Sequence, residues 1–214
     1  MARDAKVWLV GGSFPEATST DHSSKLYNTC LVHSPDGDLV ATHRKVHLFD
    51  IDIPGKITFK ESSILSPGSS ITQFNTPWGD ISVGICYDLR FPELAMIASR
   101  NAAKIMIYPG AFNLTTGPLH WSLLLRSRAL DNQFFTIGCA PARSSGDDGG
   151  YKSWGNSLVC DPMGKVLAQV ESEEQGEETL VVDLDLDSIV EARKGIPVTE
   201  QRRFDVYTEV KEVL

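Results

Sequence analysis

A buried strand that ends in a cysteine and leads into a helix is the feature that most constrains how this chain can fold. Ile81, Val83 and Ile85 alternate with small residues, as in a strand packed on both faces. Cys86 follows this strand, and Pro92 suits the first turn of a helix. The pattern predicts a strand-to-helix elbow that exposes the Cys86 side chain and leaves backbone N–H groups free to stabilise an oxyanion.

Cys86 is either a buried, inert cysteine or a nucleophile, and a nucleophilic thiol needs a nearby cation or base to ionise. Residues 43–50 offer a cation. Basic and apolar residues alternate there at the period of a strand, which places Lys45 on one face with His43 and His47. Taken alone, such a lysine is more often a solvated surface charge.

Four motifs occur in one order along the chain. They are His-Arg-Lys-Val-His-Leu-Phe at 43–49, Gly-Lys-Ile-Thr-Phe-Lys-Glu-Ser at 55–62, Gly-Ile-Cys-Tyr-Asp-Leu-Arg-Phe-Pro-Glu at 84–93, and Tyr-Pro-Gly-Ala-Phe-Asn at 108–113. Together they resemble the nitrilase superfamily of carbon–nitrogen hydrolases, over residues 8–207. Segments 49–59 and 112–121 are similar to its omega-amidase branch in particular.

The resemblance implies a catalytic set and a fold. Cys86 would be the nucleophile, Lys45 would stabilise the oxyanion together with the N–H of Tyr87, and Glu61 would support them. Removing one such oxyanion donor usually raises the barrier by about 3 kcal/mol. The implied fold is an α/β protein of the nitrilase type, an alpha-beta-beta-alpha sandwich.

The resemblance also implies a glutamate general base on an early strand, in a segment that should precede residues 6–13. No glutamate stands there. Glu16 and Glu93 follow prolines, but they belong to other motifs of the family and are not candidates for this base. We therefore expect an N-terminally truncated sandwich, or a chain that has lost its turnover.

Hydrophobic periodicity and turn residues predict alternating strands and helices. Strands are expected at 7–12, 27–33, 38–47, 71–75, 81–86, 104–108, 134–140, 156–160, 165–170 and 179–184, and helices at 91–101, 118–133 and 186–194. Loops are expected at 50–68, 144–150 and 171–178. No repeat or linker divides the chain, so residues 1–214 are expected to form a single carbon–nitrogen hydrolase domain, incomplete at its N-terminus.

Composition narrows the class of protein. A net charge of −8 and a pI near 5.1 argue against nucleic acid as a partner. Four widely spaced cysteines without a C-x-x-C pair favour reduced thiols in a cytoplasmic setting, with organellar targeting left open. No stretch suits a membrane span, and neither a metal nor another cofactor is expected. By resemblance, the full-length protein is expected to be a homodimer.

Three residues are candidates for substrate binding. Phe112 follows a predicted strand and suits a ligand wall. Arg90 either forms an ion-paired elbow with Asp88 and Glu93 or holds a substrate carboxylate, with the Thr116 hydroxyl as a second donor. Both interpretations of Arg90 stay open at this point.

The expected activity, by resemblance, is hydrolysis of the omega-amide of dicarboxylic acid monoamides such as 2-oxoglutaramate or 2-oxosuccinamate through a cysteine thioester. One alternative is another amide of the superfamily, either deaminated glutathione or an N-carbamoyl compound. The other is a catalytically impaired chain that acts as a subunit or binding protein.

Overall fold

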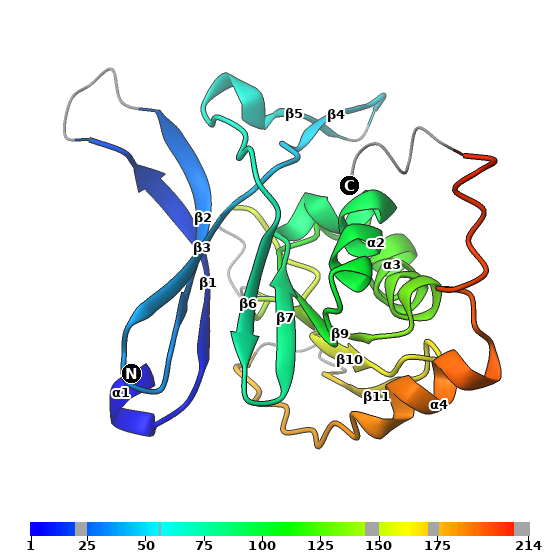
Figure 1. Cartoon of the computed structure of the whole chain (residues 1–214). Coiled ribbons are helices and arrows are strands. Elements are labelled where there is room, and N and C mark those ends of the chain that lie inside the picture. Colours follow the sequence, from blue (N-terminus) through cyan, green and yellow to red (C-terminus); the bar gives the residue numbers. More distant parts are fainter. Residues whose placement is uncertain (20–24, 56, 144–149, 171–175, 208–214) are drawn as a thin grey trace.

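Two sheets face each other in the computed structural model, which describes residues 1–19, 25–55, 57–143, 150–170 and 176–207 (Figure 1). The smaller sheet is antiparallel and consists of β1 (Leu9–Ala17), β2 (Leu26–His33) and β3 (Leu39–Arg44). The larger sheet has six strands in the order β11-β10-β9-β8-β7-β6. These are β6 (Thr72–Thr76), β7 (Gly79–Val83), β8 (Ile105–Pro109), β9 (Phe135–Cys139), β10 (Leu158–Cys160) and β11 (Val166–Gln169).

The centre of the larger sheet is parallel. Strands β7, β8 and β9 run in one direction, while β6, β10 and β11 pair antiparallel at its margins. Parallel neighbours need crossover connections, which α2 (Pro92–Arg100) and α3 (Gly117–Asn132) provide. The carboxyl ends of the three parallel strands therefore meet at one edge of the sheet, where open α/β sheets bind ligands.

Two apolar clusters hold the layers together. On β8, Met106 and Tyr108 pack against the helices, whereas Ile105 and Ile107 face the smaller sheet. This alternation follows from the two-residue period of a strand that is covered on both faces. A single strand thus contributes to the helix–sheet core and to the sheet–sheet core.

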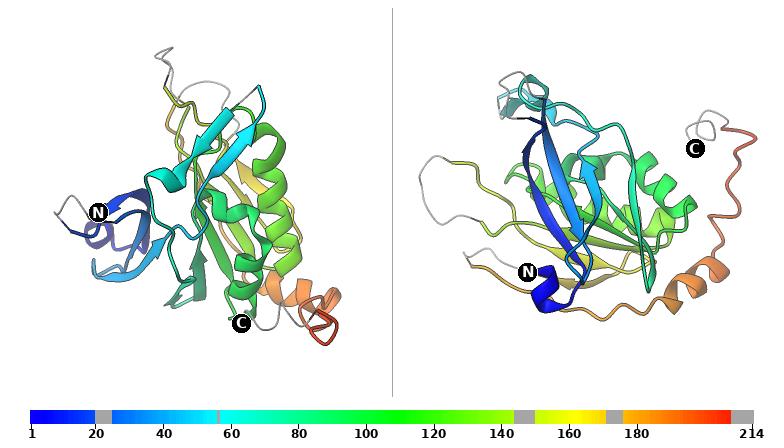
Figure 2. Two further views of the ribbon diagram at one scale, coloured as in Figure 1. Left: turned by 90° about the horizontal axis from the view of Figure 1, so that it is seen from above. Right: turned by 60° about the vertical axis from the view of Figure 1, so that its left-hand side comes forward.

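The α/β sandwich expected from the resemblance is confirmed as a fold class, with a helix layer on one side. Seen from above in Figure 2, the larger sheet lies between the helices and the smaller sheet. Within the described residues, only the short α1 (Ala2–Ala5) lies beside the smaller sheet, at one end, where Arg3 donates to the Asp36 carbonyl at 2.6 Å. No described helix has the length and apolar character needed to cross a membrane.

Two predicted elements are wrong. Residues 50–68 are not simply a loop, because β4 (Asp50–Ile53) and β5 (Ile57–Lys60) form a hairpin followed by the 3₁₀ helix η1 (Glu61–Ser63). Residues 179–184 are described but form no strand.

Other elements agree to within a few residues. The last helix is α4 (Asp187–Gly195), β1 continues beyond residue 12, and β3 ends before Lys45. Of the remaining predicted loops, residues 144–149 and 171–175 lie outside the described residues.

Candidate active site

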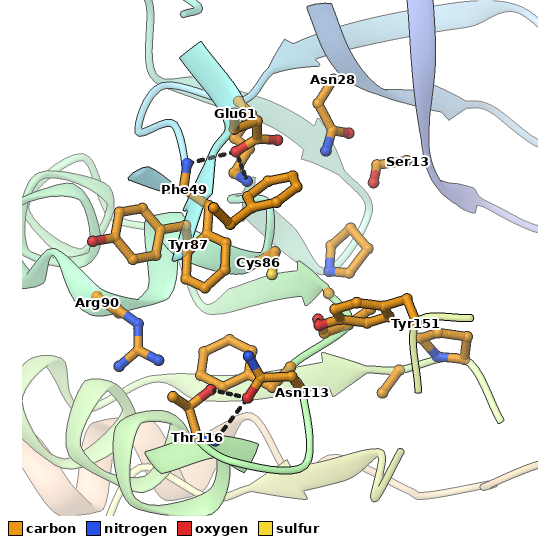
Figure 3. Close-up of a pocket in the computed structure, with 18 of the residues that line it drawn as sticks. Ser13, Asn28, Phe49, Glu61, Cys86, Tyr87, Arg90, Asn113, Thr116 and Tyr151 are labelled. Atoms are coloured by element: carbon orange, nitrogen blue, oxygen red, sulfur yellow. Dashed lines mark hydrogen bonds and ion pairs between the residues drawn. The ribbon is translucent and has the colours of Figure 1, made fainter. Parts of the chain in front are cut away.

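A cavity of about 560 Å³ opens at the carboxyl ends of the parallel strands (Figure 3). One wall comes from the segments that follow β7, β8 and β9, and the other from β1, β2 and the β4–β5 hairpin. The side chains that line it include Asn28, Lys45, Phe49, Glu61, Cys86, Tyr87, Arg90, Phe112, Asn113, Thr116, Cys139 and Tyr151. In Figure 3, Glu61 lies above Cys86, whereas Asn113 and Thr116 lie below it. We call Lys45 and Glu61 the lysine side, and Arg90, Asn113 and Thr116 the arginine side.

Cys86 stands at the predicted elbow, at the start of the 3₁₀ helix η2 (Cys86–Arg90). Its φ of 45° lies in the left-handed region, which is rare for a residue with a side chain and is typical of functional sites. Gly110, which follows β8, lies against this elbow. It must be glycine because a Cβ there would lie 2.9 Å from the Cys86 Cα. Within the described residues, the Tyr87 N–H donates no hydrogen bond and so is free to meet a ligand.

The thiol is not ionised by its surroundings alone. Burial raises the pKa of Cys86, and the Lys45 charge and a backbone hydrogen bond with Ala111 oppose that rise without cancelling it. Glu61 raises the pKa further. A Cys86 that acts as a nucleophile would therefore need a base to accept the thiol proton.

The lysine side is a buried ion pair. Lys45 Nζ lies 2.6 Å from Glu61 Oε2, and the same oxygen accepts the Phe49 N–H at 2.5 Å. With 3% of its side chain exposed, Lys45 is not the solvated surface charge of the alternative interpretation. Glu61 thereby holds the Lys45 ammonium in place and, through Phe49, also anchors the start of the β4–β5 hairpin.

Asp88 connects the cysteine elbow to the lysine segment. Its fully buried carboxylate accepts the Ile85 N–H at 2.9 Å, the His47 N–H at 2.9 Å, His47 Nδ1 at 2.8 Å and His43 Nε2 at 3.1 Å. Burial alone would raise the pKa of Asp88, but the hydrogen bonds from the two histidines and Ile85 outweigh it and lower the pKa. One carboxylate therefore holds His43 and His47, which stand two residues before and after Lys45, together with Ile85, the residue before Cys86.

The ion-paired interpretation of Arg90 is wrong. Asp88 binds histidines instead, and Glu93 forms no ion pair with Arg90 among the described residues. The Arg90 guanidinium lies over the Phe112 ring at 4.8 Å from its centroid, and Arg90 Nη1 donates to His120 Nδ1 at 3.1 Å. Burial lowers the pKa of Arg90, as expected of a desolvated cation whose described contacts are neutral.

Thr116 lines the cavity, but its hydroxyl is already used. Thr116 Oγ1 donates to Asn113 Oδ1 at 3.0 Å, since an amide oxygen can only accept. The second donor expected from this hydroxyl is therefore not available in the structure. The neighbouring Asn113, which the sequence did not single out, has an amide nitrogen without a partner among the described residues.

Aromatic side chains lie at the cavity, in the core or, like Phe112, in both. Phe112 and Tyr151 line the cavity, and the Tyr151 hydroxyl donates to the Ala111 carbonyl. Tyr108 and Trp121 belong to the core beneath the helices. Of the other cysteines, Cys139 also lines the cavity, whereas Cys30 and Cys160 are buried in strands, where burial raises the pKa of each thiol to about 11.

Sequence reasoning missed the roles of Asp88, Asn113 and His120. Asp88 was detectable in principle, because it lies two residues after Cys86 and histidines stand on both sides of Lys45. Asn113 stands three residues before Thr116, at the spacing of a side chain that caps a helix start. No local signal pairs His120 with Arg90, since 30 residues separate them.

Known proteins match this chain over most of its length. The family model described as carbon-nitrogen hydrolase matches residues 1–194. A hydrolase of Schizosaccharomyces pombe is 53% identical over 214 residues, and omega-amidase NIT2 of Homo sapiens is 50% identical over 207 residues. These alignments cover 100% and 97% of this chain, and 64% and 72% of the two relatives.

A solved structure agrees. Nit3 of Saccharomyces cerevisiae, described as a member of branch 10 of the nitrilase superfamily, superposes with a TM-score of 0.82 and 47% identity. The superposition covers 95% of this chain and 69% of Nit3. The sequence resemblance to the nitrilase superfamily is thus confirmed, and the chain belongs to the carbon-nitrogen hydrolase family.

Proposed function

We propose that this chain carries the active site of an amidase that hydrolyses the omega-amide of dicarboxylic acid monoamides, with 2-oxoglutaramate and 2-oxosuccinamate as substrates. The observation that carries this proposal is the content of one cavity. A cysteine elbow and a buried lysine stand beside an arginine that has no carboxylate partner among the described residues. Relatives of similar sequence are named omega-amidases, which supports the same substrate class.

The reaction begins with attack of the Cys86 sulfur on the amide carbonyl carbon. The new S–C bond places negative charge on the carbonyl oxygen, which Lys45 and the Tyr87 N–H stabilise. Collapse of this intermediate breaks the C–N bond: the nitrogen takes up the proton that left Cys86 and departs as ammonia, and a thioester remains on Cys86. Water then attacks the thioester, the C–S bond breaks, one proton of the water returns to the Cys86 sulfur, and the 2-oxo dicarboxylate is released.

Proton transfer is the step with the fewest candidates. Glu61 is the one carboxylate among the described residues that line the cavity, and its Oε2 already accepts from Lys45 and Phe49. Its other oxygen, Oε1, and the Asn28 Oδ1 that lines the same cavity have no hydrogen-bond donor among the described residues, and of the two only Oε1 belongs to a group that can take up a proton near neutral pH. Glu61 therefore supports Lys45 through Oε2, and we assign the proton of Cys86 to Glu61 Oε1.

The substrate's acid group would bind on the arginine side. Arg90 presents a planar guanidinium that suits two parallel hydrogen bonds to a carboxylate, and Phe112 supports it from below. The proposal includes a single hydrolase domain over residues 1–214 and a homodimer of the whole protein. Light scattering would measure the oligomeric state.

The test is ammonia release from 2-oxoglutaramate, compared with pentanamide, which has the amide but not the acid. We expect the protein to release ammonia faster from 2-oxoglutaramate and Cys86→Ser to release none. Equal rates on both amides would contradict the substrate class, and release by Cys86→Ser would contradict the mechanism.

A further inference from the structure

Asn113 is held rigidly on the loop between β8 and α3. Its Oδ1 accepts the N–H of Thr115 at 3.0 Å, the N–H of Thr116 at 2.8 Å and the Thr116 hydroxyl at 3.0 Å. Its backbone carbonyl accepts the Gly117 N–H at 2.8 Å, and the residue forms a β-bridge with Ser153. The loop therefore leaves this side chain little freedom to rotate.

These contacts settle which way the amide points. Backbone N–H groups can only donate, so the oxygen of Asn113 must face Thr115 and Thr116, and the NH₂ group must face the other way. Asn113 lines the cavity, and in Figure 3 its nitrogen points toward the space below Cys86. The arrangement aims this buried NH₂ group at that space.

No described residue accepts from this nitrogen, although the nitrogen is buried and the whole residue is only 8% exposed. Buried donors are nearly always paired with protein or with an ordered water, and leaving one unpaired is unfavourable. The Thr116 hydroxyl could otherwise donate to a ligand, but it donates to Asn113 Oδ1 instead. An acceptor in the cavity would satisfy the amide.

The surroundings favour an anionic acceptor. Arg90 lies on the same side of the cavity, over the ring of Phe112, the residue next to Asn113. The hydrogen-bond partner of Arg90 is His120, which accepts through Nδ1 and carries no negative charge. Helix α3 begins at Gly117, and the partial positive charge of its N-terminus adds to that of Arg90.

We propose that Asn113 Nδ2 donates to the distal carboxylate of the substrate and, together with Arg90, makes the site specific for amides that carry an acid group. This inference rests on the proposed function and adds a second donor to its carboxylate site. Thr116 acts as a positioning residue that fixes the Asn113 amide.

The test replaces the donor and keeps the shape. Asn113→Asp retains an oxygen for Thr115 and Thr116 but turns the nitrogen into a second, negatively charged oxygen. Asn113→Ser retains a small oxygen for Thr115 and Thr116, shortens the side chain and removes the amide nitrogen without adding charge. Asn101→Asp, at the exposed end of α2, is a control for the added charge alone.

The readout is binding of 2-oxoglutarate, measured by titration calorimetry, together with kcat/KM for 2-oxoglutaramate and pentanamide. We expect Asn113→Asp to weaken 2-oxoglutarate binding roughly a hundredfold, because two like charges would face each other. Asn113→Ser should weaken it about tenfold. Rates on pentanamide should change little, and Asn101→Asp should behave like the wild type.

Three outcomes would overturn the inference. In the first, the wild type binds 2-oxoglutarate, Arg90→Lys weakens that binding, and neither Asn113 variant weakens it. This result would mean that water satisfies Asn113 Nδ2, and the proposed function would stand without the inference. If the wild type binds no 2-oxoglutarate and does not prefer 2-oxoglutaramate, the proposed function fails together with the inference. An equal loss on both amides in a stably folded Asn113→Ser would likewise show that Asn113 serves the loop and not the acid group.

Discussion

On the lysine side of the cavity, the charged groups are paired within the protein, whereas on the arginine side the half-buried Arg90 has no charged partner among the described residues. Lys45 binds Glu61, and the neighbouring Asp88 accepts four hydrogen bonds. Arg90 contacts only neutral groups, and Asn113 Nδ2 has no partner in the described part of the chain. The first arrangement is complete without a ligand, and the second is completed by one.

Under the proposed function, the lysine side would act in catalysis and the arginine side in the choice of substrate. A preorganised cation beside a nucleophile acts on the charge that develops in the transition state, so its loss should lower kcat. An unpaired cation waiting for a carboxylate acts on the choice of substrate, so its loss should depend on whether the substrate carries an acid. Variants on the two sides should therefore fail in different ways.

The largest effect is expected at Cys86, which lies between the two sides. Cys86→Ser should lower ammonia release from any amide by about a thousandfold or more, since the weaker nucleophile cannot form the thioester. Thermal melting should stay close to that of the wild type. Cys139→Ser is the matched control because Cys139 lines the same cavity, and substantial loss in that variant would break the assignment.

Lys45→Met is the next largest change. It keeps most of the stem and removes the ammonium, so kcat/KM should fall by roughly a hundredfold on amides with and without an acid group. Steady-state kinetics on 2-oxoglutaramate and pentanamide would measure both. Near-normal rates would show that the lysine side contributes nothing to the chemistry.

Asp88→Asn tests the link between the elbow and the lysine segment. An amide cannot accept all four donors, so we expect a loss of about 3 kcal/mol in the free energy of unfolding at pH 7. The loss in kcat/KM should be roughly thirtyfold, because Cys86 and Lys45 would shift relative to each other. Urea unfolding and steady-state kinetics measure these two effects.

The pH dependence gives Asp88 a second test. Its pKa is lowered in the folded protein, so its contribution to stability is complete above the unfolded pKa of about 3.9 and declines as the pH falls further. The stability difference between wild type and Asp88→Asn should therefore shrink below about pH 4. A difference that stays constant at lower pH would rule out the charge as its cause.

The smallest change is expected from Arg90→Lys, which keeps the charge and loses the planar fork. The ratio of kcat/KM values for 2-oxoglutaramate and pentanamide should fall about tenfold, with the rate on pentanamide nearly unchanged. An equal loss on both substrates would mean that Arg90 serves the packing of Phe112 and His120.

The sequence predicted what local patterns determine. The elbow at Cys86, helices α2 and α3 and the strands around them follow from hydrophobic period and from proline at helix starts. The β4–β5 hairpin was missed because each strand has four residues and Pro54-Gly55 resembles ordinary loop punctuation.

Side-chain partners were harder to predict than side-chain types. The resemblance named Lys45 and Glu61, and the structure brings them together. It did not predict that Asp88 would accept hydrogen bonds from two histidines 41 and 45 residues earlier. It also did not predict that the Thr116 hydroxyl would donate to Asn113. These hydrogen-bond partners depend on which elements meet in space, and the local hydrophobic pattern of the sequence does not indicate them.

The most direct test of the central claim is to map the covalent intermediate. The protein would be mixed with 2-oxoglutaramate, quenched in acid and digested, and the peptides would be weighed by mass spectrometry. The account predicts an acyl group on the peptide that contains Cys86, reduced in Lys45→Met and absent in Cys86→Ser. Ammonia release without any acyl group on Cys86, or with the group on Cys139, would contradict it.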